Sequence, residues 1–164
     1  SGRHFRSVDL DQRLLALFDQ YAVPSHCIRI EVTEHALLEN PTQVKRILKN
    51  LRNHGVGIAL DDFGTGYSSL SYLHQYPFES LKIDRSFIVE LPPDDNDTQG
   101  LALVRAIQVL ADSLHMKVIA EGIEQESQRQ ALLRVGCRYG QGFLFASPQP
   151  ASTWLAANSP LLPA

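Results

Sequence analysis

Two patterns of apolar residues alternate along this chain. Short runs of consecutive apolar residues, such as 56–60, are typical of buried strands, whereas apolar residues three or four positions apart, as over 9–21, are typical of amphipathic helices. Their regular alternation predicts a parallel sheet with helices packed outside it, in about five units. The expected strands are 28–33, 56–62, 81–84, 117–120 and 140–145.

The best-defined helix follows the first strand. Asn40 is a suitable N-cap, Pro41 a suitable first helical residue, and Gly55 a suitable end. No linker interrupts the alternation, so residues 1–150 are expected to form one domain, and 151–164 a covering helix and tail. The other expected helices are 9–21, 70–75, 99–115 and 125–135, and the expected buried face after Pro41 is Val44, Ile47, Leu48 and Leu51.

Two α/β folds accommodate this order of elements: an open doubly wound sheet, and part of a (β/α)₈ barrel. A glycine-rich phosphate loop at the start of the first helix is absent, which counts against a dinucleotide-binding or P-loop sheet. In both folds the carboxyl ends of the strands gather at one rim, and active sites lie there. Chemistry is therefore expected from residues at or just past the carboxyl ends of the predicted strands.

Acidic residues occupy these positions repeatedly. Several carboxylates on one rim would repel one another unless cations neutralised them, and carboxylate oxygens are the ligands that Mg²⁺ or Mn²⁺ prefers. A single acid at a strand end is more often a helix N-cap or a loop residue, so the metal hypothesis depends on the acids occurring together. They are Glu31, Asp61, Asp62, Asp84 and Glu121.

Other residues near the predicted rim give weaker signals. A lysine such as Lys82 is more often a surface residue, but on this rim its ammonium can orient a water molecule or stabilise charge on a phosphate. The segment 140–143 has two interpretations. It is either a tight turn into a strand, or it supplies an amide and an aromatic ring that bind a base. The acidic run 94–97 lacks the full EF-hand pattern and is interpreted as a solvated loop.

Bulk properties narrow the function classes. The net charge is −3 over 164 residues, which argues against broad electrostatic binding to DNA or to anionic membranes. The sequence has no signal peptide and no membrane-spanning stretch, and Cys27 and Cys137 are expected to be buried free thiols, so a cytoplasmic location is predicted. Because Met116 is the only methionine, we interpret the chain as a piece of a longer protein.

Five motifs, in this order, resemble the EAL domain, the bacterial family of cyclic di-GMP phosphodiesterases. The resemblance covers nearly the whole chain, and segment 61–69 is its most specific part. The motifs are Glu31-Val32-Thr33-Glu34, Asp61-Asp62-Phe63-Gly64-Thr65-Gly66-Tyr67-Ser68-Ser69, Lys82-Ile83-Asp84, Glu121-Gly122-Ile123-Glu124 and Gln141-Gly142-Phe143-Leu144-Phe145.

The resemblance implies a (β/α)₈ TIM-like barrel in which two Mg²⁺ or Mn²⁺ ions activate water. The water would hydrolyse one phosphodiester bond of cyclic di-GMP and give the linear dinucleotide. Glu31 and Asp61 would bind the first ion. Asp61, Asp62 and Glu121 would bind the second ion, and Asp84 would lie close by.

Catalytic and substrate-binding roles also follow from the resemblance. Lys82 would position the attacking water, and Gln141 would help to hold the water network of the metal site, so Lys82, Glu121 and Gln141 form the expected catalytic set. Phe143 and Pro148 would lie near a guanine.

The loop that begins at Phe63 is assigned a supporting role in the same way. Glu34 would brace this loop, which contains Gly64, Thr65 and Gly66 and which in the family shapes the metal site and the dimer contact. The Glu-Ala-Leu motif of the family and its metal-binding Asn would lie upstream of this chain. The chain is therefore expected to be the C-terminal two-thirds of the domain, a partial barrel that lacks the N-terminal strands.

Such a fragment would leave sheet edges and apolar surface uncovered. Alone, we expect it to be poorly soluble or self-associating and to hydrolyse cyclic di-GMP weakly or not at all. The parent is expected to be a cytoplasmic homodimer, with or without an inner-membrane tether, fused upstream to sensory or diguanylate-cyclase-like domains, and not to bind DNA. The alternatives are a non-catalytic module that binds cyclic di-GMP or a protein, and an unrelated metal-dependent barrel enzyme.

Overall fold

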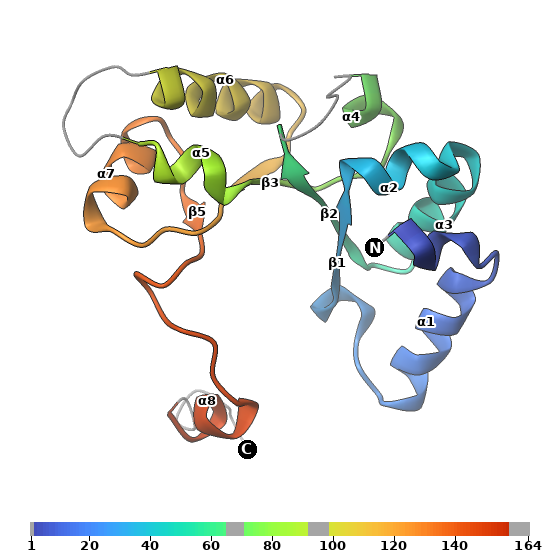
Figure 1. Ribbon diagram of the computed structural model, residues 1–164. Helices are drawn as coiled ribbons and strands as arrows, with labels where there is room; N and C mark the ends of the chain where they lie inside the picture. The colour runs from blue at the N-terminus through green and yellow to red at the C-terminus, as the bar shows by residue number, and fades with distance from the viewer. Residues whose placement is uncertain (1, 65–70, 92–98, 158–164) are drawn as a thin grey trace.

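A parallel sheet forms the centre of the computed structural model, which describes residues 2–64, 71–91 and 99–157. Five strands are hydrogen-bonded in the order β1-β2-β3-β4-β5, and all neighbours are parallel (Figure 1). The strands are β1 (Arg29–Thr33), β2 (Gly57–Phe63), β3 (Ser80–Ile83), β4 (Lys117–Ala120) and β5 (Tyr139–Gly140).

The order of the strands in space is their order in the sequence. A doubly wound sheet reverses its strand order at a switch point, whereas a (β/α)₈ barrel adds each strand beside the previous one. The sheet therefore has the topology of part of a barrel. The predicted alternation of about five strand–helix units is confirmed.

Helices flank the sheet at both of its ends (Figure 1). Helices α1 to α3 lie beside β1 and β2, and α5 to α7 lie beside β3 to β5. Across the described part of the chain, no helix combines the length and the apolar character needed to cross a membrane. The helices are η1 (Gly2–Arg6), α1 (Leu10–Gln20), η2 (Ser25–Cys27), α2 (Glu34–Glu39), α3 (Pro41–Asn53), α4 (Ser71–Gln75), α5 (Arg85–Val89), α6 (Gln99–Ser113), α7 (Glu126–Arg134) and α8 (Ala151–Ala157).

Helix α3 follows its sequence signals closely. The side chain of Asn40 accepts a hydrogen bond from the backbone N–H of Gln43 at 3.3 Å, and Pro41 is the first helical residue. The helix ends before Gly55, whose φ of 88° lies in the left-handed region that glycine adopts readily. All four residues predicted for its inner face are buried: Val44, Ile47, Leu48 and Leu51.

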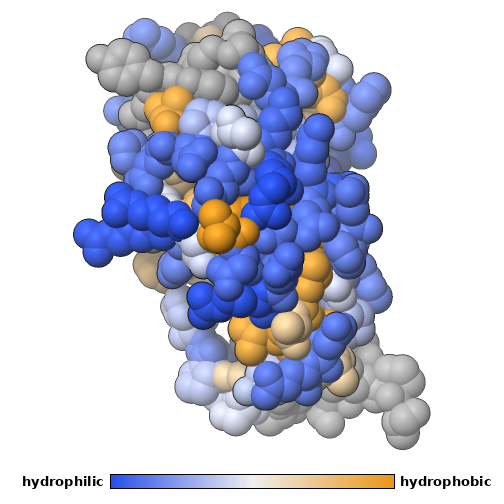
Figure 2. Space-filling model, turned by 90° about the vertical axis from the view of Figure 1, so that its right-hand side faces the viewer, coloured by the Kyte–Doolittle hydropathy of each residue, from blue (hydrophilic) through white to orange (hydrophobic). Residues whose placement is uncertain are grey.

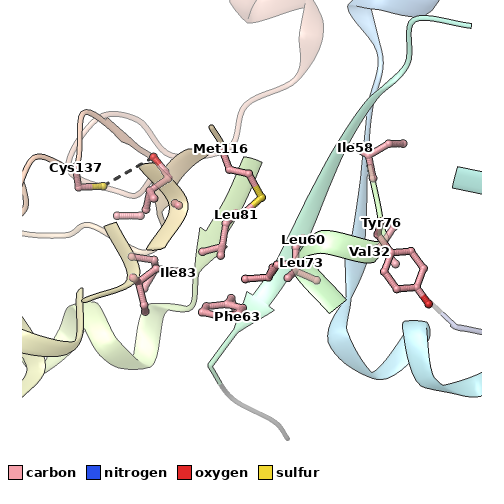
Figure 3. Packing of buried hydrophobic residues seen from close by; sticks show 14 of the residues in the cluster. Val32, Ile58, Leu60, Phe63, Leu73, Tyr76, Leu81, Ile83, Met116 and Cys137 are labelled. Atoms are coloured by element: carbon pink, nitrogen blue, oxygen red, sulfur yellow. Dashed lines mark hydrogen bonds between the residues drawn. The ribbon is translucent and has the colours of Figure 1, made fainter. Parts of the chain in front are cut away.

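The neighbouring strands β2 and β3 are buried on both faces, β3 along its whole length and β2 as far as Leu60. Leu60 of β2 and Leu81 of β3 are register partners, and both are fully buried. Figure 3 shows the side chains of Leu60, Leu81 and Phe63 gathered between these strands. Burial of each such side chain contributes roughly 1.5–3 kcal/mol, so the core holds the carboxyl ends of β2 and β3 in fixed positions.

Helix α1 is tied to α3 by a buried acid that no sequence pattern indicated. The Asp11 side chain is fully buried, and its Oδ2 accepts hydrogen bonds from Asn50 Nδ2 at 2.7 Å and from Arg46 Nη1 at 3.0 Å. Burial alone would raise the pKa of Asp11, but the hydrogen bonds from Asn50 and Arg46 outweigh burial and hold the pKa below its ordinary value.

Two expectations are corrected. The last strand was predicted to cover 140–145, but β5 ends at Gly140 and a turn follows, in which the N–H of Phe145 donates to the carbonyl of Gly142 at 3.1 Å. Helix α8 is present and its residues 151–154 are exposed, and the covering role expected of 151–164 stays a prediction. Cys137 is buried as expected, whereas Cys27, in the short turn before β1, is exposed.

Candidate functional site

Lys82 of β3 lies at the centre of a cluster of carboxylates at the rim of the sheet. Its side chain is only 5% exposed, and its Nζ is 2.7 Å from Oε2 of Glu31 and 3.1 Å from Oδ1 of Asp61. It also forms an ion pair with Oε1 of Glu121. These acids come from β1, from β2 and from the residue after β4. The fold thus brings four segments that are far apart in the sequence around one ammonium.

The adjacent acids of β2 lie on an irregularity in the sheet. Side chains of consecutive residues in a regular strand point to opposite faces. Between β2 and β3 the register advances from Leu60 to Phe63 on one strand and only from Leu81 to Ile83 on the other, so β2 carries one extra residue. Asp62 there has φ 55°, in the left-handed region. This bulge explains how both acids contribute to the same rim.

The pKa values describe a cluster in which one cation faces several anions. Burial alone would lower the pKa of Lys82, but hydrogen bonds to Glu121, Glu31 and Asp61 raise it well above its ordinary value. The lysine therefore keeps its proton at neutral pH. Burial raises the pKa of Asp62, and the negative charges of Asp61, Asp84 and Glu31 raise it further.

Glu121 shows the same imbalance of charge. Burial raises the pKa of its carboxyl, and the charges of Asp61 and Glu31 act in the same direction, although Lys82 opposes them. The single ammonium thus does not compensate all the acids around it. Negative charge remains in excess at the rim, and a bound cation would relieve it.

The residues present fit a hard divalent cation by their chemistry. The donors are all carboxylate oxygens, and the buried Oδ1 of Asp61 has the Lys82 ammonium, 3.1 Å away, as its partner among the described residues. Over 2–64, 71–91 and 99–157, no three acidic, histidine or cysteine side chains converge as ready-made metal ligands. The carboxylates point toward Lys82 instead. The lysine therefore offsets part of the repulsion between them, which was expected from the sequence to be offset by metal ions alone.

Gln141 reaches the same cluster from the segment after β5. Its Nε2 donates a hydrogen bond to Oε1 of Glu121 at 2.8 Å. Backbone hydrogen bonds hold this segment against Ile123, whose N–H donates to the carbonyl of Gln141 at 3.1 Å and whose carbonyl accepts from Leu144 at 3.0 Å. A side chain at Gly142 would collide with the backbone of Ile123, so glycine is what allows this close approach.

A pocket of about 450 Å³ opens beside Glu121 and Gln141. Phe143 and Pro148, which the sequence placed near a guanine, both line it, and Phe143 is 66% exposed. The volume is within the usual range for small-molecule sites. The lining also includes two large side chains that were not anticipated, Arg85 and Trp154.

Only one of these two additions carried a signal in the sequence. Arg85 directly follows the strand-end acid Asp84, so the rule that singled out the rim acids could also have found it. Its Nη2 donates to Oε1 of Glu124 at 2.6 Å. Trp154 belongs to α8, and no pattern connects that helix to the rim.

Asp84 lies near the cluster but has a different role in the local structure. It is the N-cap of α5, where its Oδ1 accepts hydrogen bonds from the N–H and the hydroxyl of Ser86, and these bonds lower its pKa. Among the described residues, the ion pairs of Lys82 do not include Asp84. The helix-cap alternative considered for a strand-end acid thus applies to Asp84, although its charge still acts on Asp62.

The predicted loop-bracing residues are described only in part. Glu34 is buried in the first turn of α2, and its Oε2 has no hydrogen-bond partner among the described residues. Gly64 has φ 95°, and a Cβ on it would lie 3.0 Å from the ring of Phe87. Thr65 and Gly66 lie outside the described residues, so bracing of their loop by Glu34 stays a prediction.

Comparisons with known proteins point to one family. The family model of the EAL domain matches residues 1–148. The Pseudomonas aeruginosa protein named bifunctional diguanylate cyclase/cyclic di-GMP phosphodiesterase MucR is 47% identical over 142 residues, which are 87% of this chain and 20% of that protein. This chain spans about a fifth of the length of most of the curated relatives that it matches.

Solved structures agree in fold. The MucR phosphodiesterase in complex with cyclic di-GMP superposes with a TM-score of 0.86 at 40% identity, over 94% of this chain and 62% of that one. The manganese and cyclic di-GMP complex of Klebsiella pneumoniae BlrP1 has a TM-score of 0.79 at 30% identity, over 88% of this chain and 36% of that one. The five parallel strands are therefore part of a TIM-like barrel.

Proposed function

This chain belongs to the EAL domain family, and from that membership we propose that it carries the catalytic rim of a cyclic di-GMP phosphodiesterase. The reaction is hydrolysis of one phosphodiester bond of cyclic di-GMP to the linear dinucleotide. The observation that carries the proposal is the convergence of Glu31, Asp61 and Glu121 on the Lys82 ammonium, next to the pocket that Phe143 lines.

The metal would be held by the acids of the rim. Glu31, Asp61, Asp62 and Glu121, with Asp84 nearby, are proposed to bind two divalent cations, Mg²⁺ or Mn²⁺. The complexes of BlrP1 with calcium and with manganese support a divalent cation in this family. Bound ions would supply Lewis-acid polarisation of the phosphate and lower the pKa of water.

The remaining catalytic work falls to side chains of the chain itself. Lys82, which stays protonated, orients the attacking water and stabilises negative charge on the phosphate. Gln141 fixes the orientation of the Glu121 carboxylate through its 2.8 Å hydrogen bond. The exposed ring of Phe143, with Pro148, gives a guanine an apolar surface on which to stack.

The context of the whole protein is also a proposal. Because the relatives are about five times longer, we infer that this chain is joined upstream to sensory or diguanylate-cyclase-like domains, as the name of MucR suggests. We further propose a cytoplasmic homodimer that does not bind DNA, with 1–150 as the catalytic unit and 151–164 as its C-terminal extension. The net charge of −3 supports the absence of DNA binding.

The test is cyclic di-GMP hydrolysis with Mg²⁺ and with Mn²⁺. It uses the 164-residue chain and a longer form to which the N-terminal strands of the domain are joined. We expect weak or no turnover by the short chain and clear turnover by the longer form. Asp61→Asn should abolish that turnover, while Asp19→Asn, at an exposed position of α1, should leave it unchanged.

Two other outcomes would each contradict one of these expectations. Binding of cyclic di-GMP by the longer form without cleavage would identify a receptor module. Full turnover by the 164 residues alone would contradict the expectation that the fragment carries an incomplete site.

A further inference from the structure

The pocket beside Glu121 and Gln141 has exposed aromatic side chains in its wall. Phe143 is 66% exposed and Trp154 is 56% exposed, and both line the pocket. Figure 2 shows a different surface on the side of the molecule that carries α1 to α3, where hydrophilic residues dominate and hydrophobic ones form small separate groups. Exposed aromatic rings in a pocket provide a stacking surface for a flat ring such as a nucleobase.

Stacking alone does not select one base. Every nucleobase has a flat face, so aromatic rings bind adenine and guanine with similar ease. A choice between the two has to come from polar groups that meet the edge of the base. The polar side chains in the wall of the pocket are Arg85, Glu121, Gln141 and Ser147.

Arg85 is the member of this set that can make the choice. Glu121 and Gln141 are already joined by a hydrogen bond of 2.8 Å, which belongs to the acidic cluster at the rim. The hydroxyl of Ser147 both donates and accepts, so it suits either base. The guanidinium of Arg85 only donates, and it presents its N–H groups in a rigid fork.

Two neighbours hold the Arg85 side chain in place. Its Nη2 donates to Oε1 of Glu124 at 2.6 Å, in an ion pair at the surface. Its aliphatic part lies against Gly122, where a Cβ would come within 2.7 Å of Cδ of Arg85. Gly122 has φ 70°, a left-handed conformation that glycine adopts readily. The absence of a side chain at this position therefore leaves the space that Arg85 occupies.

The ion pair with Glu124 also narrows the ligands that Arg85 suits. With this carboxylate beside it, the guanidinium brings little net charge, whereas its remaining N–H groups can still donate. Such a group suits a neutral edge with two acceptors better than it suits a phosphate. Guanine has this edge, because its O6 and N7 are both acceptors and match the arginine fork. Adenine carries a donor, its N6 amino group, in place of O6, and donor would face donor.

From these contacts we propose that Arg85 determines specificity for guanine, by donating two hydrogen bonds to O6 and N7 of a guanine that stacks on Phe143. Gly122 and Glu124 are positioning residues, since they act through Arg85. The inference rests on the proposed function for its ligand, cyclic di-GMP. It concerns recognition of the base and not cleavage, so binding tests it separately from hydrolysis.

The test compares the binding of cyclic di-GMP and of cyclic di-AMP to the longer form, measured by isothermal titration calorimetry. EDTA removes divalent cations, so the proposed hydrolysis does not consume the ligand. The wild type should prefer cyclic di-GMP. Arg85→Lys keeps the positive charge but loses the fork, and it should reduce this preference by about tenfold or more. Glu124→Gln should reduce the preference by a smaller factor, because it loosens the arginine without removing it.

A modified ligand tests the contact at a single atom. Cyclic di-GMP made with 7-deazaguanine has a C–H group in place of the N7 acceptor. It should bind the wild type about fivefold or more weakly than cyclic di-GMP does, whereas Arg85→Lys should bind the two ligands about equally. The matched control is Arg129→Lys, which alters a similar ion pair of 2.6 Å with Glu126 on α7 and should leave every ratio unchanged.

The outcomes separate this inference from the proposed activity. Equal weakening of cyclic di-GMP and cyclic di-AMP in Arg85→Lys would overturn the inference and would point to a phosphate contact. A wild type that binds the 7-deaza ligand as tightly as cyclic di-GMP, or that binds neither cyclic dinucleotide, would overturn it too. Hydrolysis by the same protein would then still uphold the phosphodiesterase. Conversely, the expected ratios without hydrolysis after Mn²⁺ is added would support the role of Arg85 and contradict the proposed activity.

Discussion

Nε2 of Gln141 donates a hydrogen bond at 2.8 Å to the same Glu121 oxygen, Oε1, that pairs with Lys82. One donor on β3 and one in the segment after β5 thus fix one carboxylate. A carboxylate that is oriented in this way does not have to lose rotational freedom when a ligand arrives.

Replacement of Gln141 should therefore loosen the rim without removing an acid. We expect Gln141→Leu to weaken Mn²⁺ binding by about 10-fold to 100-fold, as is usual for residues that orient metal ligands. Isothermal titration calorimetry of the longer form measures this affinity. The matched control is Gln130→Leu, which breaks a similar hydrogen bond of 2.7 Å to Glu126 on α7 and should leave the affinity unchanged. Equal loss in both variants would mean that the Gln141 effect is not local.

Lys82 also makes the protein dependent on its cation for stability. Lys82→Met leaves Glu31, Asp61 and Glu121 facing one another at the rim. In EDTA we expect the free energy of unfolding to fall by about 2 kcal/mol or more. Added Mn²⁺ should then raise the melting temperature of this variant more than that of the wild type. Lys49→Met, at an exposed position of α3, serves as the control, and an equal response to Mn²⁺ in all three proteins would refute this account.

The buried Asp11 gives a prediction for the opposite end of the molecule. Asp11→Ala leaves the donors Asn50 and Arg46 without their acceptor and should lower the free energy of unfolding by about 2 kcal/mol. Urea denaturation measures the change. Asp19→Ala on the same helix removes an exposed acid and should change stability by less than about 0.5 kcal/mol.

The pH dependence of the same contact has a defined sign. The pKa of Asp11 is lower in the folded chain than in the unfolded chain, where it is about 3.9. Its stabilising contribution is therefore fully present above that pH and is lost as the pH falls through the folded-state pKa. Asp11→Asn should show a shallower decline of stability with falling pH in this acid range. Identical acid profiles for the variant and the wild type would contradict the assignment.

Gly64 allows the cost of a steric contact to be separated from the cost of a backbone conformation. Gly64 and Gly55 have nearly the same φ, 95° and 88°, but a Cβ would lie 3.0 Å from Phe87 at the first position and no closer than 3.9 Å to any neighbour at the second. Gly55→Ala should lower the free energy of unfolding by about 1 kcal/mol through the strained backbone conformation alone. Gly64→Ala should cost more, and Phe87→Leu in the same chain should recover the difference. Equal losses of stability at both glycines would show that the Phe87 ring moves aside without a cost in free energy.

Much of the architecture could be predicted because it depends on local patterns. Apolar runs and helical spacing located four of the five strands and the main helices, and Asn40 with Pro41 located the start of α3. The rule that strand ends share a rim brought Glu31, Asp61, Glu121 and Lys82 together in advance. These features need no knowledge of how distant side chains pack.

What could not be predicted depends on contacts between distant segments. The extra residue in β2 at Asp62 appears only when β2 is paired with β3, since the sequence alone suggests a regular strand. The strand β5 ends just before Gly142 comes close to the backbone of Ile123, and an apolar run cannot reveal this contact. The position of Asp11 likewise depends on where α3 places Asn50.

The positive φ of Asp62 also restricts which residues can replace it during evolution. A single nucleotide change in an aspartate codon yields Asn, Gly, Ala, Val, Glu, His or Tyr. Of these, Gly and Asn occupy left-handed backbone most readily, whereas Val is strongly disfavoured there. Relatives in which the residue equivalent to Asp62 is no longer an acid should therefore carry Asn or Gly at this position. They would keep the bulge in β2 after losing the negative charge of the carboxylate at this position.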